Sequence, residues 1–301
     1  MKMKKTYFFV ILSFICGVAL FLVFYFQSQF VQISLKTAAA GTPCVITGIE
    51  GRQYTLGIDL GSKYPLSLSK DILDAIHNKI AQGAVQWKDA QGKTYEAPSY
   101  LIPQISIGNL VLTNVIAAQE DDNFITNTTL WNDNQYASIC QKSGTLGRPV
   151  LEKTNLLMDF PNSIMLASND KKALKRAGIF LDKMVAISFE TGNKGIILKV
   201  DTDLGILRLS LDTGATFTLI RSSCFQGQSC VKDNRGFFAF TTSKFSIGDA
   251  NFGEKRLLLY NITSELHEID GFLGMDFLEH HVIYIDYQNK ILYLDPPVND
   301  Q

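Results

Sequence analysis

Short runs of apolar residues alternate with turn residues along most of the chain, a pattern typical of β-strands. Residues 185–200 (VAISFETGNKGIILKV) and 281–294 (HVIYIDYQNKILYL) show it most clearly. Helical patterns are few. They cover residues 68–80, where Ser69 is a suitable N-cap, and the shorter segments 146–153, 169–178 and 273–281. The pattern therefore predicts an all-β protein.

The same landmarks occur twice, in the same order. Each half has an apolar strand running into Asp-x-Gly, a Lys-Asp-x-x-Gly turn, a strand with Ser-Ile-Gly, and a closing segment that begins at a glycine. The paired landmarks are Asp59/Asp212, 88–92/232–236, 106–108/246–248 and 147–164/274–291. An ordered series of four matches predicts an internal duplication.

The amino-terminal segment differs from the rest of the chain. Residues 7–26 form an uncharged apolar run, long enough to cross a bilayer as a helix of about 30 Å. Lys2, Lys4 and Lys5 precede it, and the positive-inside rule then places the amino terminus in the cytoplasm and the rest outside. A cleaved signal peptide is the alternative, but its apolar core usually spans only about 7–15 residues. We expect a single-pass membrane anchor with an exported domain.

These features divide the chain into six parts. We expect a cytoplasmic tail, a transmembrane anchor, a stalk, a first lobe, a linker and a second lobe. Their bounds are 1–6, 7–26, 27–42, 43–167, 168–182 and 183–297.

Composition narrows the range of partners. The chain has 301 residues, of which 46% are hydrophobic, enough to bury a substantial core. Its 28 basic and 29 acidic residues give a net charge of −1, without the positive excess typical of proteins that bind phosphate backbones. We therefore expect no nucleic-acid partner.

Four cysteines follow the apolar run: Cys44, Cys140, Cys224 and Cys230. An even number in an exported domain favours two disulfides. Cys224 and Cys230 would close a tight loop, which leaves Cys44 to pair with Cys140. A metal site is the alternative interpretation of Cys-x5-Cys, but this spacing does not fit a zinc knuckle. We expect no metal ion.

Two equivalent Asp-x-Gly loops in a duplicated β protein suggest a pair of carboxyl groups that work together. Two carboxyl groups about 3 Å apart cannot both ionise, so they share a proton and titrate as a pair. The ionised member can take a proton from water while the protonated member donates to a carbonyl oxygen. Glycine lets the backbone turn tightly and leaves the carboxylate accessible.

The motif in the second half resembles a known family. LDTGATFTLI at residues 211–220 resembles the active-site loop of aspartic proteases, and residues 270–294 resemble the closing segment of retropepsin-like domains, with a hydrophobic-hydrophobic-Gly motif at 272–274. Thr145, Leu146 and Gly147 form a weaker version in the first half. The resemblance covers nearly everything after residue 43. It implies an all-β fold of two retropepsin-like β-barrel lobes in one chain, preceded by one transmembrane helix.

The resemblance also assigns roles. Asp59 and Asp212 would form a catalytic dyad that activates water, with no cofactor, against an extended polypeptide. Cys224 and Cys230 would match a small disulfide loop that follows the active-site strand in pepsin-like enzymes. The residues expected to support the active-site loops are Gly61, Ser62, Thr213, Gly214 and Ala215. Those expected to form two flaps over the substrate are Lys88, Asp89, Gly92, Lys232, Asp233 and Gly236.

One residue departs from the family pattern. Family members usually carry Thr or Ser after the catalytic Asp, whose hydroxyls hydrogen-bond across the pair of loops, and this chain has Thr213 but Leu60. Such a pair would be held less rigidly. A hydroxyl of Ser62 bonded to Asp59 would favour the ionised form of Asp59 and leave Asp212 as the proton carrier.

The sequence therefore favours a membrane-anchored aspartic endopeptidase. The alternative is a catalytically dead module of the same fold that binds a peptide or protein, which Leu60 favours. A structural protein of the cell envelope is a third interpretation, supported only by the anchor and the cysteines. Asp159 and Asp286, which recur in the closing segments, are expected to cap the turn into the last strand of each lobe.

Overall fold

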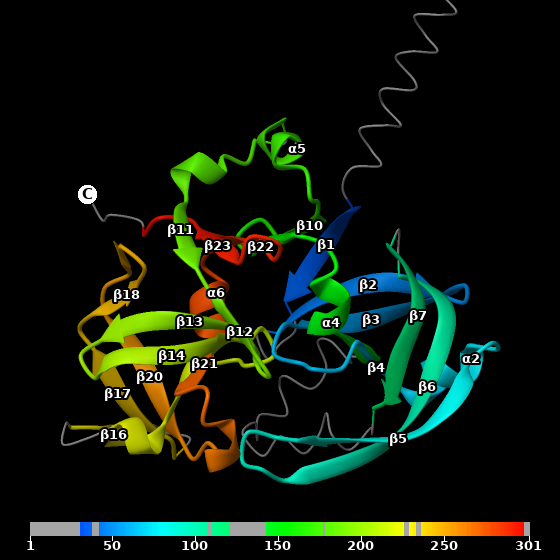
Figure 1. Cartoon of the computed structure of the whole chain (residues 1–301), viewed down its shortest axis with the longest axis horizontal. Helices are drawn as coiled ribbons and strands as arrows, with labels where there is room; N and C mark the ends of the chain where they lie inside the picture. Colours follow the sequence, from blue (N-terminus) through cyan, green and yellow to red (C-terminus); the bar gives the residue numbers. More distant parts are fainter. Residues whose placement is uncertain are drawn as a thin grey trace, which may run out of the picture.

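The computed structural model describes residues 31–37, 42–107, 110–120, 143–176, 178–225, 229–232 and 236–297. The described chain is mostly β-strand, and it forms two lobes that lie side by side with a shared sheet along one side (Figure 1). The all-β, two-lobed architecture expected from the sequence is confirmed.

The first lobe is one curved sheet with a short helix on it. The helix α2 (Lys70–Ala75) follows Ser69 and buries Ile72 and Leu73. The strands of this lobe are β2 (Pro43–Ile49), β3 (Arg52–Asp59), β4 (Leu66–Leu68), β5 (Ile80–Lys88), β6 (Thr94–Ile107), β7 (Leu110–Gln119) and β8 (Gly144–Gly147).

The second lobe repeats this plan with shorter strands. They are β12 (Glu190–Gly192), β13 (Gly195–Thr202), β14 (Gly205–Leu211), β15 (Leu219–Arg221), β16 (Val231–Lys232), β17 (Phe238–Thr242), β18 (Phe245–Ile247), β19 (Ala250–Asn251), β20 (Lys255–Tyr260) and β21 (Gly271–Leu273). Single 3-10 turns interrupt the chain at η1 (Leu181–Lys183), η2 (Ser222–Cys224) and η3 (Ser264–Leu266).

The two lobes pair their strands in the same way. In the first, β3 runs parallel to β8, β8 is antiparallel to β4, and β4 is parallel to β7. In the second, β14, β21, β15 and β20 follow the same sequence of parallel and antiparallel pairs. This agreement is the structural counterpart of the repeat found in the sequence.

Six strands from both halves form the sheet that joins the lobes. Their order is β11 (Val185–Ser188), β23 (Ile291–Leu294), β22 (Val282–Asp286), β9 (Leu156–Asp159), β10 (Ile164–Ala167) and β1 (Val31–Thr37). The antiparallel pair β9–β22 lies at the centre, and each half of the chain contributes three strands. The strand β1 lies within residues 27–42, where a stalk was expected, so part of that segment belongs to the folded domain.

The turns in this sheet are capped by the two recurring aspartates. Oδ1 of Asp159 accepts a hydrogen bond from the Asn162 N–H at 3.0 Å. Oδ1 of Asp286 accepts one from the Asn289 N–H at 3.1 Å. The predicted turn-capping role of both aspartates is confirmed.

Short helices follow β8 and β21 and bring the closing segments against the active-site loops. They are α4 (Arg148–Leu151) and α6 (Met275–Leu278), which begin after Gly147 and Gly274. A Cβ atom on Gly147 would lie 1.8 Å from the Tyr64 carbonyl oxygen, and one on Gly274 would lie 2.4 Å from that of Phe217. Only glycine leaves room for this approach of backbone to backbone, which gives the repeated glycine its physical reason.

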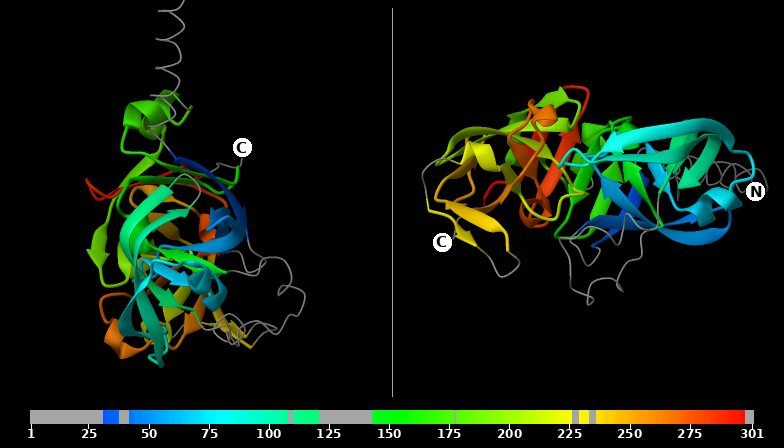
Figure 2. Two further views of the ribbon diagram at one scale, coloured as in Figure 1. Left: turned by 90° about the vertical axis from the view of Figure 1, so that its right-hand side faces the viewer. Right: turned by 90° about the horizontal axis from the view of Figure 1, so that it is seen from below.

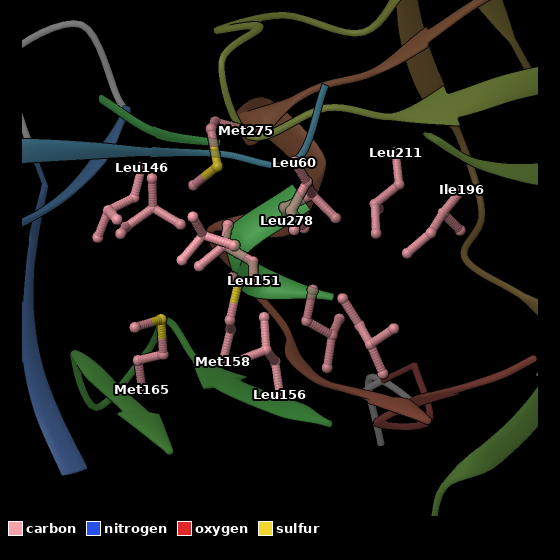
Figure 3. Packing of buried hydrophobic residues seen from close by; sticks show 14 of the residues in the cluster. Leu60, Leu146, Leu151, Leu156, Met158, Met165, Ile196, Leu211, Met275 and Leu278 are labelled. Carbon is pink, nitrogen blue, oxygen red and sulfur yellow. The ribbon is translucent and has the colours of Figure 1, made fainter. Parts of the chain in front are cut away.

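The apolar core is continuous between the lobes. Leu60, which follows Asp59 in the chain, is buried in one cluster with Leu151, Met275 and Leu278 (Figure 3). Each such side chain contributes on the order of 1.5–3 kcal/mol when fully buried. The core therefore ties the lobes together close to the proposed dyad.

Two of the main expectations concern segments outside the described residues. The expected anchor at residues 7–26 is one, and the expected pairing of Cys44 with Cys140 is the other, because Cys140 lies outside the described residues. Among the residues that the structure does describe, no helix is long and apolar enough to cross a membrane.

Candidate active site

Each proposed catalytic aspartate lies at the end of a central strand. Asp59 is the last residue of β3, and its Oδ1 accepts hydrogen bonds from the N–H groups of Gly61 at 2.8 Å and Ser62 at 2.9 Å. Asp212 directly follows β14, and its Oδ1 accepts one from the Gly214 N–H at 2.8 Å. The parallel neighbours β8 and β21 fix the two loops in equivalent positions.

The two carboxyl groups face one another across the boundary between the lobes. A Cβ atom on Gly61 would lie 2.5 Å from Cγ of Asp212, and one on Gly214 would lie 2.8 Å from Cγ of Asp59. Each carboxyl group is thus packed against the glycine of the opposite lobe. Both glycines are required for space rather than for an unusual backbone angle.

This arrangement changes the acidity of Asp212. Burial, followed by the nearby charge of Asp59, raises the pKa of Asp212 from 3.8 to about 7, against the opposing effects of the Gly214 N–H and Lys194. Two carboxyl groups in contact titrate as a pair rather than independently. Asp212 is therefore the better proton carrier of the two, and Asp59 the better base.

The loops are linked by one threonine. The buried Oγ1 of Thr213 donates to the Ile58 carbonyl at 2.7 Å and accepts from the Leu60 N–H at 3.0 Å. The Leu60 side chain instead lies in the apolar core. As the sequence predicted, only Thr213 contributes a side-chain hydroxyl to the link, and Leu60 contributes none.

Ser62 and Ala215 follow Gly61 and Gly214, and they make different hydrogen bonds. The Ser62 hydroxyl lies against the backbone of Tyr64, accepting its N–H at 3.2 Å, while the Ser62 amide donates to Asp59. The contact expected from the hydroxyl is thus made by the amide. Ala215 accepts the Met275 N–H at 2.8 Å and anchors its loop to α6.

The β5–β6 hairpin crosses from the first lobe to the second. Its turn is closed by Asp89, whose Oδ1 accepts the N–H groups of Gln91 and Lys93, and by Gly92 at a φ of +89°. Figure 1 and the right-hand view of Figure 2 show the hairpin reaching the near edge of the second lobe. Residues 88–92, expected as the first flap, thus lie at the tip of a hairpin that reaches the second lobe.

Three contacts fix the tip of this hairpin on the second lobe. The Ala90 carbonyl accepts the Thr263 N–H at 2.9 Å, and a Cβ on Gly92 would lie 3.2 Å from the Thr263 hydroxyl. Lys88 Nζ lies 2.7 Å from the Glu265 carboxylate. The hairpin is thus closed over the boundary between the lobes.

The receiving segment of the second lobe is held by one arginine. The Arg221 guanidinium donates to the carbonyls of Ile262 at 2.7 Å, Thr263 at 3.0 Å, Leu266 at 2.8 Å and Ile269 at 3.0 Å. Four hydrogen bonds from one planar group hold this segment in a fixed conformation, so that it forms a rigid contact surface for the hairpin tip. Sequence reasoning missed Arg221, because nothing in the local pattern around it indicates contacts 41–48 residues away.

Aromatic rings stiffen the first hairpin. Trp87 stacks on Tyr95 at 5.8 Å, and Tyr64 meets Trp87 edge-on at 6.0 Å. Tyr64 belongs to the segment that follows Asp59, so the rings connect the hairpin to the first active-site loop. These residues were also missed, although the alternation of Trp87 with Gln86 and Lys88 is a signal that one face of the hairpin carries a large ring.

The second expected flap is not positioned like the first. Lys232 lies in β16, at the outer edge of the second-lobe sheet, and its ammonium lies 5.8 Å above the Phe238 ring of its own hairpin. A Cβ on Gly236 would lie 3.7 Å from the Lys232 side chain. Asp233 lies outside the described residues. The described part of this hairpin thus stays on its own lobe (Figure 1).

The expected disulfide between Cys224 and Cys230 is wrong. No disulfide joins cysteines in the part of the chain that the structure describes. Sγ of Cys224 lies 3.6 Å from Oδ1 of Asp270, and burial together with this carboxylate raises the pKa of the Cys224 thiol. Cys230 is exposed beside the edge strand β16. Cys44 is buried in β2, and its expected partner Cys140 lies outside the described residues.

No group of three or more potential metal ligands occurs among the described residues. The boundary between the lobes holds the two carboxyl groups of Asp59 and Asp212. A coupled acid and base that face each other beneath a hairpin can activate water and protonate a carbonyl oxygen at the same time.

Solved structures share this architecture. An aspartic proteinase from Irpex lacteus superposes with a TM-score of 0.58 at 14% identity, over 89% of this chain and 98% of that one. Soybean basic 7S globulin gives 0.57 at 9% identity, over 89% and 95%. Conglutin gamma, a basic 7S globulin from lupine seeds, gives 0.58 at 11% identity, over 89% and 95%.

These likenesses establish a pepsin-like two-lobed fold for this chain. They do not single out a tandem of retropepsin-like units, the finer form of the expectation. No protein-family model and no curated protein matches the sequence. Because the structural neighbours include both a proteinase and seed globulins, the fold alone does not decide the activity.

Proposed function

We propose that the chain is an aspartic endopeptidase that hydrolyses peptide bonds with water activated by Asp59 and Asp212. The observation that carries the proposal is the facing pair of carboxyl groups, in which the pKa of Asp212 is raised to about 7 while Asp59 accepts two backbone N–H groups. One group then holds a proton at the pH at which the other is ionised.

The proposed reaction uses both groups in one step. Asp59 takes a proton from a water molecule, the water oxygen attacks the carbonyl carbon, and Asp212 gives its proton to the carbonyl oxygen. The tetrahedral intermediate then collapses as the amine leaves with the proton held by Asp59, and Asp212 regains its own. No metal or cofactor takes part in this scheme.

The substrate in this proposal is an extended polypeptide. A strand-like segment would lie between the dyad and the β5–β6 hairpin. Ala215, Leu219 and Tyr260 are partly buried near the hairpin tip, packed on the cluster that contains Ile262 and Phe272. When the hairpin lifts, these apolar groups become available, which favours apolar side chains on either side of the cleaved bond.

We further propose that residues 7–26 anchor the enzyme in a membrane with the folded part exported. Support for this rests on the length of the apolar run and the lysines before it.

A second candidate is a module of the same fold that binds a peptide or protein without cutting it. Leu60 favours it, because the link between the active-site loops is one-sided. The 7S globulins among the structural neighbours also show that pepsin-like folds occur in proteins not described as proteinases.

A mixed peptide library, incubated with the full chain in detergent from acid to neutral pH, separates the candidates. Cleavage by the wild type that is absent from Asp212→Asn supports the enzyme. Peptide binding without cleavage by a folded sample supports the binding module. Cleavage that persists in Asp212→Asn contradicts the dyad.

A further inference from the structure

The linker between the lobes has an exposed basic surface. We call Lys171, Lys172, Lys175, Phe180 and Lys183 the linker face; all five are exposed. Lys171 is partly neutralised, because its ammonium lies 2.6 Å from the buried Asp286. Residues 168–183 contain five basic and two acidic residues, whereas the whole chain has a net charge of −1.

The linker is fixed to the folded domain rather than free. Leu174 of α5 (Lys171–Arg176) is fully buried and packs with Leu157, Leu166 and Tyr284 on the outer side of the joining sheet, and Ile179 packs against the same cluster. The Ile179 N–H donates to the Leu174 carbonyl at 2.9 Å, which ends the helix. Because the apolar side chains face the sheet, the lysines face outward.

Phe180 is unusual within this surface. Its ring is 39% exposed, and the Lys183 ammonium lies 5.0 Å above it. An exposed aromatic ring among lysines is the combination found on surfaces that rest in the interface of a bilayer, with the ring at the headgroup level and the charges on anionic lipids.

The linker face lies where the chain enters the folded domain. Val31, the first residue of β1, pairs with Ala167, one residue before the linker. The expected anchor ends at Phe26, so only residues 27–30 separate it from β1, and Phe26 and Val31 are at most about 18 Å apart. A bilayer that holds the anchor would therefore lie within reach of the linker face.

The hairpin over the active site is on the other side of the molecule. Figure 1 and the left-hand view of Figure 2 show α5 and the start of β1 at one end, and the β5–β6 hairpin at the opposite end. A surface that touches the linker face would therefore lie far from this hairpin.

We propose that the linker face rests on a bilayer surface of anionic phospholipids, so that the β5–β6 hairpin lies on the side away from the membrane. This inference rests on the proposed anchor, and it deepens the proposed function by naming the substrate class. The substrate is a polypeptide segment outside the bilayer, and transmembrane segments and their immediate flanks are excluded.

Lysine footprinting of the full chain in nanodiscs tests the contact. The protein is reconstituted in discs of neutral phosphatidylcholine or of phosphatidylcholine with phosphatidylglycerol, and acetylation of each lysine by a water-soluble ester is followed by mass spectrometry. We expect Lys172, Lys175 and Lys183 to react about tenfold more slowly in the anionic discs, because each lysine at such a surface gains about fivefold in binding. High salt should remove the difference.

The chain provides its own matched control. Lys232 also lies over an exposed ring, Phe238, but at the outer edge of the second lobe. Its rate should not depend on the lipid. In the variant Lys172→Glu/Lys175→Glu, Lys183 should react at the same rate in both discs, whereas Lys232→Glu should leave the protection of Lys183 unchanged.

Three results would overturn the inference. If the chain stays in the discs but Lys172, Lys175 and Lys183 react equally in both lipids, the linker face does not contact the bilayer, although the anchor stands. Equal slowing of Lys232 indicates a general lipid effect instead. If the full chain does not remain with either disc, the anchor itself fails. Peptide cleavage, measured on the same samples, reports the proposed enzyme independently of all three.

Discussion

The hydroxyl of Thr213 accepts a hydrogen bond from the Leu60 backbone N–H at 3.0 Å, across the boundary between the lobes. The same hydroxyl donates to the Ile58 carbonyl, so one side chain fixes the loop that carries Asp59. Leu60 has no hydroxyl to form the equivalent hydrogen bond to the other loop, and its side chain packs into the apolar core. The two lobes of a duplicated fold thus use different chemistry at equivalent positions.

Removal of the Thr213 hydroxyl should weaken this link. Thr213→Val keeps the side-chain volume but leaves the buried Leu60 N–H without its acceptor, and we expect the free energy of unfolding to fall by about 2–4 kcal/mol. Thr213→Ser, which keeps the hydroxyl, should lie within about 1.5 kcal/mol of the wild type. Chemical denaturation measures the unfolding free energy of both variants. Equal values would show that the hydrogen bonds of Thr213 contribute little to stability.

Leu60 should act through packing alone. It is 1% exposed, and Leu60→Ala would leave a cavity in the core directly after Asp59. We expect a loss of about 2–5 kcal/mol in unfolding free energy. Leu60→Met, which conserves volume, should cost less than about 1.5 kcal/mol. If Leu60→Ala unfolds with the same midpoint as Leu60→Met in denaturant titrations, the packing account of this position is wrong.

Gly61 should be essential for the position of the dyad. A methyl group there would meet the Asp212 carboxyl at 2.5 Å, so Gly61→Ala must displace one loop. We expect peptide cleavage to fall at least about 100-fold, as displacements of about 1 Å in catalytic groups do. Gly48→Ala is the control, because its nearest neighbour would be at 3.7 Å. Full cleavage by Gly61→Ala would contradict the facing geometry.

The pair Lys88–Glu265 should hold the hairpin closed only weakly. The two side chains are 46% and 57% exposed, so their coupling is expected to be about 0.2–1 kcal/mol. Lys88→Met and Glu265→Gln should each speed the opening of the hairpin by at most about fivefold, and the double variant no more than either alone. Hydrogen exchange of the hairpin amides measures this. Additive effects would mean that the two side chains do not interact.

Much of the fold could be predicted because its signals are local. Apolar alternation indicated strands, and the repeated motifs indicated two equivalent lobes. The strand at residues 31–37 was missed, although Val31, Ile33 and Leu35 alternate with Gln32, Ser34 and Lys36. That alternation is a strand signal, and it was overlooked because the segment follows the apolar run.

The parts that could not be predicted depend on distant contacts. Lys88 and Glu265 are 177 residues apart, and nothing near either residue indicates that the hairpin of one lobe is held by the other. The cysteines show the same limit, since an even count predicts pairing but not whether two thiols face each other. Cys224 faces Asp270 instead.

The pH dependence of cleavage tests the dyad most directly. In the proposed mechanism cleavage requires a proton on Asp212, whose pKa is raised to about 7, so kcat/KM should fall as the pH rises through about 7. It should also fall in acid, where Asp59 gains a proton. A bell-shaped profile for the wild type, with cleavage lost at least about 100-fold in both Asp59→Asn and Asp212→Asn, is the predicted result. A rate that keeps rising above pH 8, or either variant cleaving like the wild type, would contradict the account.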